Sequence, residues 1–275
     1  KKEDPMASSS SANHTVSKRG LWGMDGCQLN KYSCPHLSEV LLSNANLRHL
    51  DLSRNPLMDE GVAQLCEALR QPACRLQTLC LQQCEITPRG CQDLAFVLAS
   101  NPNLRSLDVG GNNIGDAGVR LLSKALLHPH CGLKELSLES CQLTRACCED
   151  LASVIAHSQT LHELDSLDLA TNVLGDSAVT VLCEGLWYTD PGLFLGHLLW
   201  QAGGVQTDHS SLEVLSSALS CNPHLTSLDL LCRDFDPQGP WLCSALARPT
   251  CSLGEELGES LEGVLGTGLR LWQAD

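Results

Sequence analysis

The chain has 275 residues, of which 43% are apolar and only 4% aromatic, and it carries a formal net charge of −14. This apolar content is enough for one continuous core, which aliphatic side chains must fill. The negative charge argues against nucleic-acid backbones and anionic membrane surfaces as partners, because both would repel the chain. A basic protein partner is compatible with the charge. The plain alternative is that acidity keeps an aliphatic-rich chain soluble.

Residues 1–20 are rich in Ser, Lys and Asn and lack hydrophobic periodicity, so we expect them to be disordered. Residues 21–46 form an incomplete version of a pattern that then recurs along the chain. Its strand positions hold Trp22, Met24, Cys27 and Leu29. A degenerate end repeat of this kind caps an otherwise open core.

The pattern is clearest between Leu47 and Leu57, which reads L-x-x-L-x-L-x-x-N-x-L. Its five matches begin at Leu47, Leu76, Leu104, Leu133 and Leu164. The central L-x-L predicts a short strand with alternating sides, so Leu50 should point into the core and Asp51 and Ser53 outwards. We expect parallel strands near 50–52, 79–81, 107–109, 136–138 and 167–169.

The position three residues after each L-x-L alternates between Cys and Asn. It reads Cys27, Asn55, Cys84, Asn112, Cys141 and Asn172. The chain turns out of the strand there, and an Asn amide can satisfy backbone groups of a neighbouring turn that would otherwise be buried without partners. Cys in the same position is a small buried residue with a weak donor.

The second half of each repeat has the apolar spacing of a helix, as in Val62, Leu65, Ala68 and Leu69. Short polar side chains precede these helices and are expected to cap them. They are Asp59, Asp116 and Asp176 in the Asn repeats and Thr87 and Thr144 in the Cys repeats. No repeat can bury its own apolar face, so the repeats should stack into a curved solenoid with parallel strands on the concave side and helices outside.

The spacing becomes irregular in the second half of the chain. The match at Leu164 begins late, and we place the extra residues in the loop around 158–163, where added length is tolerated. Further on, Gly196 and Gly203 stand where Leu is required, and Arg233 replaces the Asn or Cys.

These substitutions predict a weak junction, so 187–275 should open at lower cost than 21–186. We therefore divide the chain into a disordered segment 1–20, a repeat solenoid 21–246 that is irregular from 187, and a degenerate repeat or tail 247–275.

Two alternating repeat types with Cys and Asn in alternation resemble the ribonuclease-inhibitor-like class of leucine-rich repeats. The stretches LWGM at 21–24 and NPNL at 101–104 are similar to the C-terminal repeat domain of NLRP-type NOD-like receptors. The resemblance covers about 21–186. It implies an α/β leucine-rich-repeat solenoid, or horseshoe, with a parallel concave sheet and outer helices.

Sixteen cysteines in a secreted protein would suggest a disulfide framework. At least six of them occupy repeat positions that call for a small packed residue, which favours free thiols in a reducing compartment. These are Cys27, Cys66, Cys84, Cys91, Cys141 and Cys148. No N-terminal segment has the pattern of a signal peptide, and the longest apolar run, 192–205, is too short to cross a bilayer. We expect a cytoplasmic protein without membrane insertion.

The sequence contains no G-x-x-x-x-G-K-[ST] and no C-x-x-C, and its histidines are scattered. We therefore expect no enzyme activity, no cofactor and no metal. A Cys nucleophile with a His base is the alternative that spacing leaves open, because such partners meet only in space.

The outward positions of the predicted strands form the candidate binding site. A rigid sheet would hold these side chains in one concavity, which suits protein recognition. The residues chosen are His49, Asp51, Arg54, Gln82, Asp108, Glu135, Ser137, Glu139 and Asp168. The plain alternative is a solvated polar face without a specific partner.

Two functions remain open. Similarity to NOD-like receptors implies a ligand-sensing or autoinhibitory repeat domain of a cytosolic receptor in innate immunity or inflammasome regulation. Its partners would be proteins, including other domains of the same receptor. Similarity to ribonuclease inhibitor implies instead a stand-alone cytosolic inhibitor of a basic enzyme. Those inhibitors have more repeats and a denser acidic and aromatic C-terminal end, so we favour the first.

Overall fold

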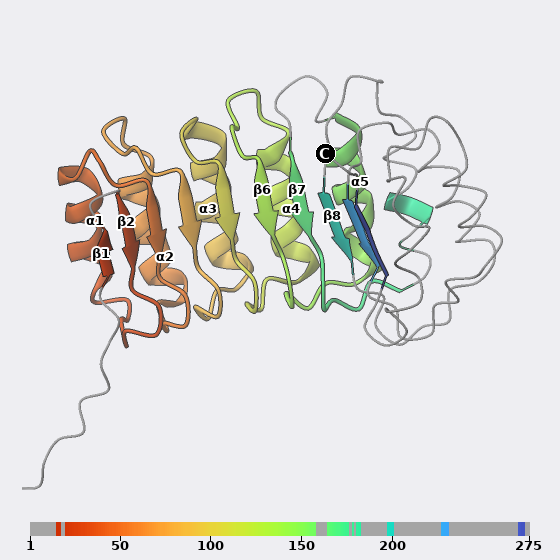
Figure 1. Cartoon of the computed structure of the whole chain (residues 1–275), viewed down its shortest axis with the longest axis horizontal. Helices are drawn as coiled ribbons and strands as arrows, with labels where there is room; N and C mark the ends of the chain where they lie inside the picture. The colour runs from red at the N-terminus through yellow and green to blue at the C-terminus, as the bar shows by residue number, and fades with distance from the viewer. Residues whose placement is uncertain are drawn as a thin grey trace, which may run out of the picture.

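The computed structural model describes residues 15–17, 20–157, 164–175, 178, 180–182, 197–200, 227–230 and 269–272. They form a sheet of ten strands that follow one another in chain order, with the helices along one face of it (Figure 1). We call the other face the open face; it is the one that the sequence analysis assigns to the concave side. No helix within these described ranges is long and apolar enough to cross a membrane.

Each repeat contributes one short strand. The strands are β1 (Thr15–Ser17), β2 (Leu21–Gly23), β3 (His49–Asp51), β4 (Thr78–Cys80), β5 (Ser106–Asp108), β6 (Glu135–Ser137), β7 (Ser166–Asp168), β8 (His197–Trp200), β9 (Ser227–Leu230) and β10 (Leu269–Trp272). From β2 to β9 all pairings are parallel, which confirms the predicted sheet. The strands β3 to β7 each begin and end one residue earlier than predicted. Each strand contains the first Leu of the L-x-L and one residue on either side of it.

Antiparallel strands lie at both ends of this parallel sheet. β1 pairs with β2, and β10 pairs with β9. The strand Thr15–Ser17 lies inside the segment 1–20, whose separation from the solenoid remains a prediction. β8 and β9 show that the repeat phase continues beyond 187. The residues behind the predicted weak junction, Gly196, Gly203 and Arg233, lie outside the described ranges, as does the loop 158–163.

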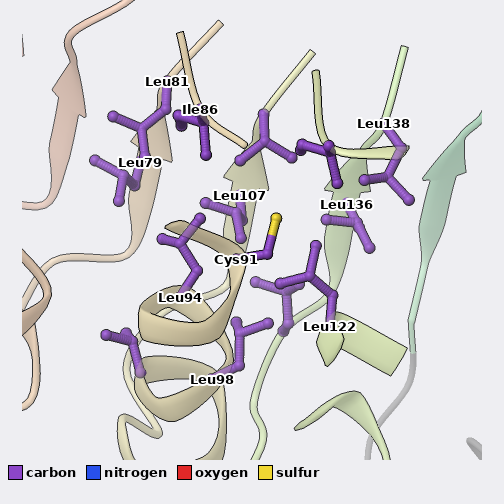
Figure 2. Packing of buried hydrophobic residues seen from close by; sticks show 14 of the residues in the cluster. Leu79, Leu81, Ile86, Cys91, Leu94, Leu98, Leu107, Leu122, Leu136 and Leu138 are labelled. Carbon is purple, nitrogen blue, oxygen red and sulfur yellow. The ribbon is translucent and has the colours of Figure 1, made fainter. Parts of the chain in front are cut away.

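The helices pack behind the sheet. They are α1 (Cys34–Ser43), α2 (Met58–Leu69), α3 (Pro88–Ser100), α4 (Gly115–Leu126), the 3-10 helix η1 (Arg145–Cys147) and α5 (Cys148–His157). Figure 2 shows Leu79, Leu107 and Leu136 side by side on three strands, with Cys91 and Leu94 of α3 facing them. All five are buried. The core is therefore one continuous layer between sheet and helices, in which each repeat depends on its neighbours.

Ser53 is more buried than its predicted outward position implies. It is only 7% exposed, and its backbone carbonyl accepts the N–H of Gly26 at 2.9 Å. The alternation of sides ends at Leu52, because the Asp51 carboxylate accepts the Ser53 N–H at 3.0 Å and bends the chain into a turn. The clear alternation of burial therefore covers residues 49–52, one residue beyond the strand itself.

The Asn positions form the predicted bridges between turns. Asn112 Nδ2 donates to the carbonyls of Leu81 and Val109, both at 2.8 Å, and Asn112 Oδ1 accepts the N–H groups of Cys84 (2.9 Å) and Ile86 (3.0 Å). Asn172 makes the equivalent bonds to its own neighbours. Asn55 donates to the carbonyls of Met24 and Leu52 and accepts the N–H of Leu29, whereas the Cys27 N–H bonds to Met24 O. These amides satisfy backbone groups that the stacking removes from water.

The Cys residues occupy the same position in alternate repeats and also bond to the preceding repeat. The thiols of Cys84 and Cys141 donate to Leu52 O and Val109 O of the preceding repeats, each at 3.3 Å. Both side chains are buried and unpaired to other cysteines, as predicted. Cys27 is only half-buried, because its repeat lies at the end of the stack.

The Asp caps act on a different helix from the one we predicted. Asp59 lies inside the first turn of α2, and its carboxylate reaches across to the start of α3. There it accepts the backbone N–H groups of Thr87 (2.9 Å) and Gly90 (3.0 Å) and the Thr87 hydroxyl (2.5 Å). Asp116 binds Thr144 in the same way. Thr87 itself caps α3 as predicted, by accepting the Arg89 N–H. Asp176 lies outside the described residues.

We expect Asp59→Ala to lower the free energy of unfolding by about 1–3 kcal/mol, because it leaves the N–H groups at the start of the next helix without an acceptor. Glu60→Ala is the matched control. Glu60 lies in the same first turn of α2 and is exposed, so it shares any effect of charge on the α2 dipole but not the bonds to α3. Urea unfolding of both variants measures the difference, and equal losses would contradict a cap between repeats.

Candidate functional site

The strands bring most of the predicted site residues together on the open face. Strand register aligns His49, Thr78, Ser106, Glu135 and Ser166 in one row across the sheet. A second row, one side chain further along each strand, contains Asp51, Cys80, Asp108, Ser137 and Asp168. Gln82 and Glu139 follow where the strands end. Arg54 lies outside these two rows, in the turn that follows β3.

The three aspartates of the second row accept hydrogen bonds from the turns that follow their strands. Asp51, Asp108 and Asp168 each accept the backbone N–H two residues later, at 2.8–3.0 Å. Asp108 also accepts a hydrogen bond of 2.6 Å from Gln82 Nε2. These carboxylates therefore hold the turn that follows each strand, a role that the sequence analysis did not assign to them.

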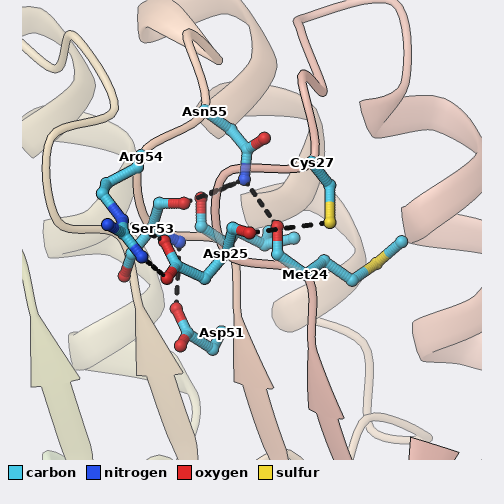
Figure 3. Close-up of polar contacts among 8 residues, drawn as sticks. Met24, Asp25, Cys27, Asp51, Ser53, Arg54 and Asn55 are labelled. Carbon is cyan, nitrogen blue, oxygen red and sulfur yellow. Dashed lines mark hydrogen bonds and ion pairs between the residues drawn. The ribbon is translucent and has the colours of Figure 1, made fainter. Parts of the chain in front are cut away.

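Arg54 is engaged within the chain. Its guanidinium forms an ion pair with Asp25, and Arg54 Nε donates to Asp25 Oδ1 at 2.6 Å (Figure 3). This hydrogen bond lowers the pKa of the Asp25 carboxyl. Arg54 has a positive φ of 57° in the turn that follows β3. Asp25 belongs to the incomplete first repeat, and its spacing of one repeat from Arg54 is the signal that could have identified it.

Glu135 and Glu139 differ from these residues. Glu135 is exposed and Glu139 half-buried, and within the described part of the chain neither carboxylate takes part in a hydrogen bond or an ion pair. Ser137 lies between them on the same strand. Among the acidic residues of the site, Glu135 and Glu139 are therefore the two whose carboxylates have no hydrogen-bond donor in the described part of the chain.

Cys80 lies in the second row between Asp51 and Asp108. Burial raises the pKa of its thiol to about 12, and the two carboxylates add to this effect. The thiol therefore stays protonated at neutral pH and is a poor nucleophile. Across the described ranges, no group of three or more His, Cys, Asp or Glu side chains is arranged to hold a metal ion. The chemistry offered by the open face is hydrogen bonding and negative charge.

Comparisons with known proteins agree with the fold. The family profile described as Leucine Rich repeat matches residues 43–66 and 100–123. Mouse NACHT, LRR and PYD domains-containing protein 5 is 46% identical over 232 residues, which is 84% of this chain and 19% of the mouse protein. Human NACHT, LRR and PYD domains-containing protein 12 is 41% identical over 228 residues, 82% of this chain and 21% of that protein.

Pig ribonuclease inhibitor is 38% identical over 261 residues, which is 90% of this chain and 56% of the inhibitor. The chain thus spans about a fifth of the length of the NACHT-containing relatives and about half of the inhibitor. Both resemblances identified from the repeat pattern are confirmed.

Proposed function

Since this chain is a leucine-rich-repeat protein related both to the NACHT, LRR and PYD domains-containing proteins and to ribonuclease inhibitors, we propose that it is a protein-recognition module. The observation that supports this most is the open face. It presents ordered polar side chains on a parallel sheet whose turns are held by buried amides and thiols, so its binding groups are positioned before a partner arrives.

We propose more specifically that the module senses ligands or holds a NOD-like receptor inactive, by binding other domains of the receptor in the cytoplasm. The free buried thiols fit a reducing compartment. Identities of 41–46% to two NACHT-containing relatives favour this role. The second candidate is a stand-alone inhibitor of a basic enzyme, which the similarity to pig ribonuclease inhibitor favours.

Binding of the full chain to two immobilised proteins separates these functions. One is the purified NACHT module of the mouse relative, and the other is bovine pancreatic ribonuclease A, whose activity is measured in parallel. Sensor or autoinhibitor function predicts micromolar or tighter binding to the NACHT module without inhibition of the ribonuclease. The inhibitor function predicts the reverse.

The surface used is tested with Ser137→Arg, which places a large charged side chain at the centre of the open face. Phe96→Arg on the exposed side of α3 is its control. We expect Ser137→Arg to weaken binding at least about ten-fold and Phe96→Arg to leave it unchanged. Binding to neither protein, or loss of binding only with Phe96→Arg, would overturn the proposed function.

A further inference from the structure

The edge of the sheet at which β3 to β6 begin is basic, although the chain as a whole is acidic (Figure 1). Four loops run along this edge from a helix to the next strand, at 44–48, 70–77, 101–105 and 127–134. They contain four arginines and one lysine but no Asp or Glu, in a chain whose 32 acidic residues outnumber its 18 basic ones. We call the four arginines the arginine edge; they are Arg48, Arg70, Arg75 and Arg105.

Backbone hydrogen bonds place two of these arginines in one row. The Gln77 N–H donates to Arg48 O, and the Arg105 N–H donates to Gln77 O, both at 2.7 Å. Arg48 and Arg105 therefore lie two strands apart, which is about 10 Å at the usual strand spacing. Arg75 comes two residues before Gln77, in the loop that lies between them.

The guanidinium groups of this row are held in place by backbone carbonyls. Arg48 Nη1 donates to Ala45 O at 2.7 Å, and Arg105 Nη1 donates to Gly132 O at 2.8 Å. Position 132 leaves room for Arg105 only as glycine, because an added Cβ would lie 2.6 Å from Arg105 Nη1. Each guanidinium has further N–H donors, and no carboxylate in the described ranges pairs with either group. Both groups are therefore positioned before a partner arrives.

The other two arginines are exposed. In the described part of the chain, neither Arg70 nor Arg75 takes part in a side-chain hydrogen bond or an ion pair, and Glu67 in the last turn of α2 does not pair with Arg70. Lys134 differs from them, because it pairs with Asp165 at 3.1 Å. The dipole of α2 accounts for Arg70, which is the C-cap residue of that helix, but not for the arginines that lie nearer the strands. The positive charge of this edge is thus not used by the fold.

We propose that the arginine edge, a surface separate from the open face, docks an extended acidic segment of a protein partner. Its charge is complementary to a run of Asp or Glu, which guanidinium groups bind through paired hydrogen bonds. A segment in the polyproline II conformation returns to the same side every three residues, about 9 Å along its axis. Acidic side chains three residues apart therefore match the spacing of Arg48 and Arg105, with Arg75 between them. A nucleic acid is a poorer match, because its long run of phosphates would also meet the net charge of −14.

The test uses the full chain and a fluorescein-labelled peptide of repeated Glu-Pro-Pro triplets, which places Glu at every third residue. Fluorescence anisotropy at about 50 mM salt measures its binding. Arg75→Gln/Arg105→Gln removes two charges from the arginine edge. Arg89→Gln/Arg145→Gln removes two charges from exposed positions at the opposite edge, where the helices begin, and is the matched control. We expect the first variant to bind about ten-fold more weakly and the control less than about two-fold more weakly.

Thermal unfolding shows whether both variants are folded to the same extent. Arg75→Gln alone removes no hydrogen bond or ion pair of the described chain, so it decides the test if loss of the Arg105 bond to Gly132 destabilises the double variant. We expect it to weaken binding about three-fold. Equal weakening by the two double variants, unchanged binding by Arg75→Gln, or tighter binding of an oligothymidylate than of the peptide would overturn the proposal. Ser137→Arg leaves the arginine edge intact, so a failure of the open face as a recognition surface is a separate result.

Discussion

We expect Asn112→Ala to lower the free energy of unfolding by about 3–6 kcal/mol, a large part of the roughly 5–15 kcal/mol that stabilises a typical domain. The Asn112 amide makes five buried contacts, with the carbonyls of Leu81, Val109 and Gly110 and with the N–H groups of Cys84 and Ile86. Truncation leaves backbone groups of two adjacent repeats without partners in a position that excludes water.

Asn113→Ala is the control for this substitution. Asn113 is the adjacent residue in the same turn and is exposed, so its loss should change the unfolding free energy by less than about 0.5 kcal/mol. Asn112→Cys is a stricter test of the alternation between Asn and Cys. Cys occupies the equivalent position in alternate repeats, but a thiol is a weak acceptor and would not replace the bonds from the N–H groups of Cys84 and Ile86. Urea denaturation should find Asn112→Cys clearly less stable than the parent, and a stability equal to the parent would show that the alternation is not structurally required.

The repeat pattern predicted the parallel sheet, its phase and the roles of Asn and Cys because each of these is repeated along the chain. The Leu side chains of successive strands must occupy equivalent places in one core, so the position of Leu50 in one repeat determines that of Leu79 and Leu107 in the next two. A one-residue error would have turned every core residue to the wrong face. A prediction made for one repeat can therefore be checked against the equivalent positions of the adjacent repeats.

Contacts between repeats were predicted less well. Asp59 was assigned to the helix beside it in sequence, although it binds Thr87 of the next repeat. Ser53 was expected to be exposed from strand alternation, but it lies in the turn after the strand and is only 7% exposed. Asp25 was missed because its repeat matches the pattern poorly. The errors at Asp59 and Asp25 concern side chains whose partners lie about one repeat away, and the propensity of a single segment contains no information on such pairs.

The sequence predicted the candidate site only in part. Periodicity identified which residues share the open face, but not which of them are already used by the fold. Asp51 and Asp108 hold turns and Arg54 binds Asp25, so only the structure separates these residues from Glu135 and Glu139. The division of the chain at 20 and 246 remains a prediction, as does the weak junction after 187.

The buried thiols predict a large loss of stability at alkaline pH. Burial raises the pKa of the Cys84, Cys91 and Cys141 thiols from about 9 to about 12, and all three side chains have no exposed area. The folded state therefore keeps protons that the unfolded chain releases above pH 9. A group with a raised folded pKa gives its full stabilisation below the unfolded pKa and loses it as pH rises toward the folded one. The affected window is about pH 9–12.

The expected size follows from proton linkage, at about 1.4 kcal/mol per pH unit for each thiol, so the three together should cost about 4 kcal/mol at pH 10 relative to pH 7.5. Urea unfolding at both pH values, with a reductant present, measures this loss. Cys84→Ala/Cys91→Ala/Cys141→Ala is the matched variant: its absolute stability is lower, but its loss between the two pH values should be smaller than that of the parent by about 4 kcal/mol, because Lys and Tyr titrate equally in both proteins. A triple variant that loses as much stability as its parent would mean that these thiols ionise in the folded state as readily as in the unfolded chain, and that the core around them is open to water.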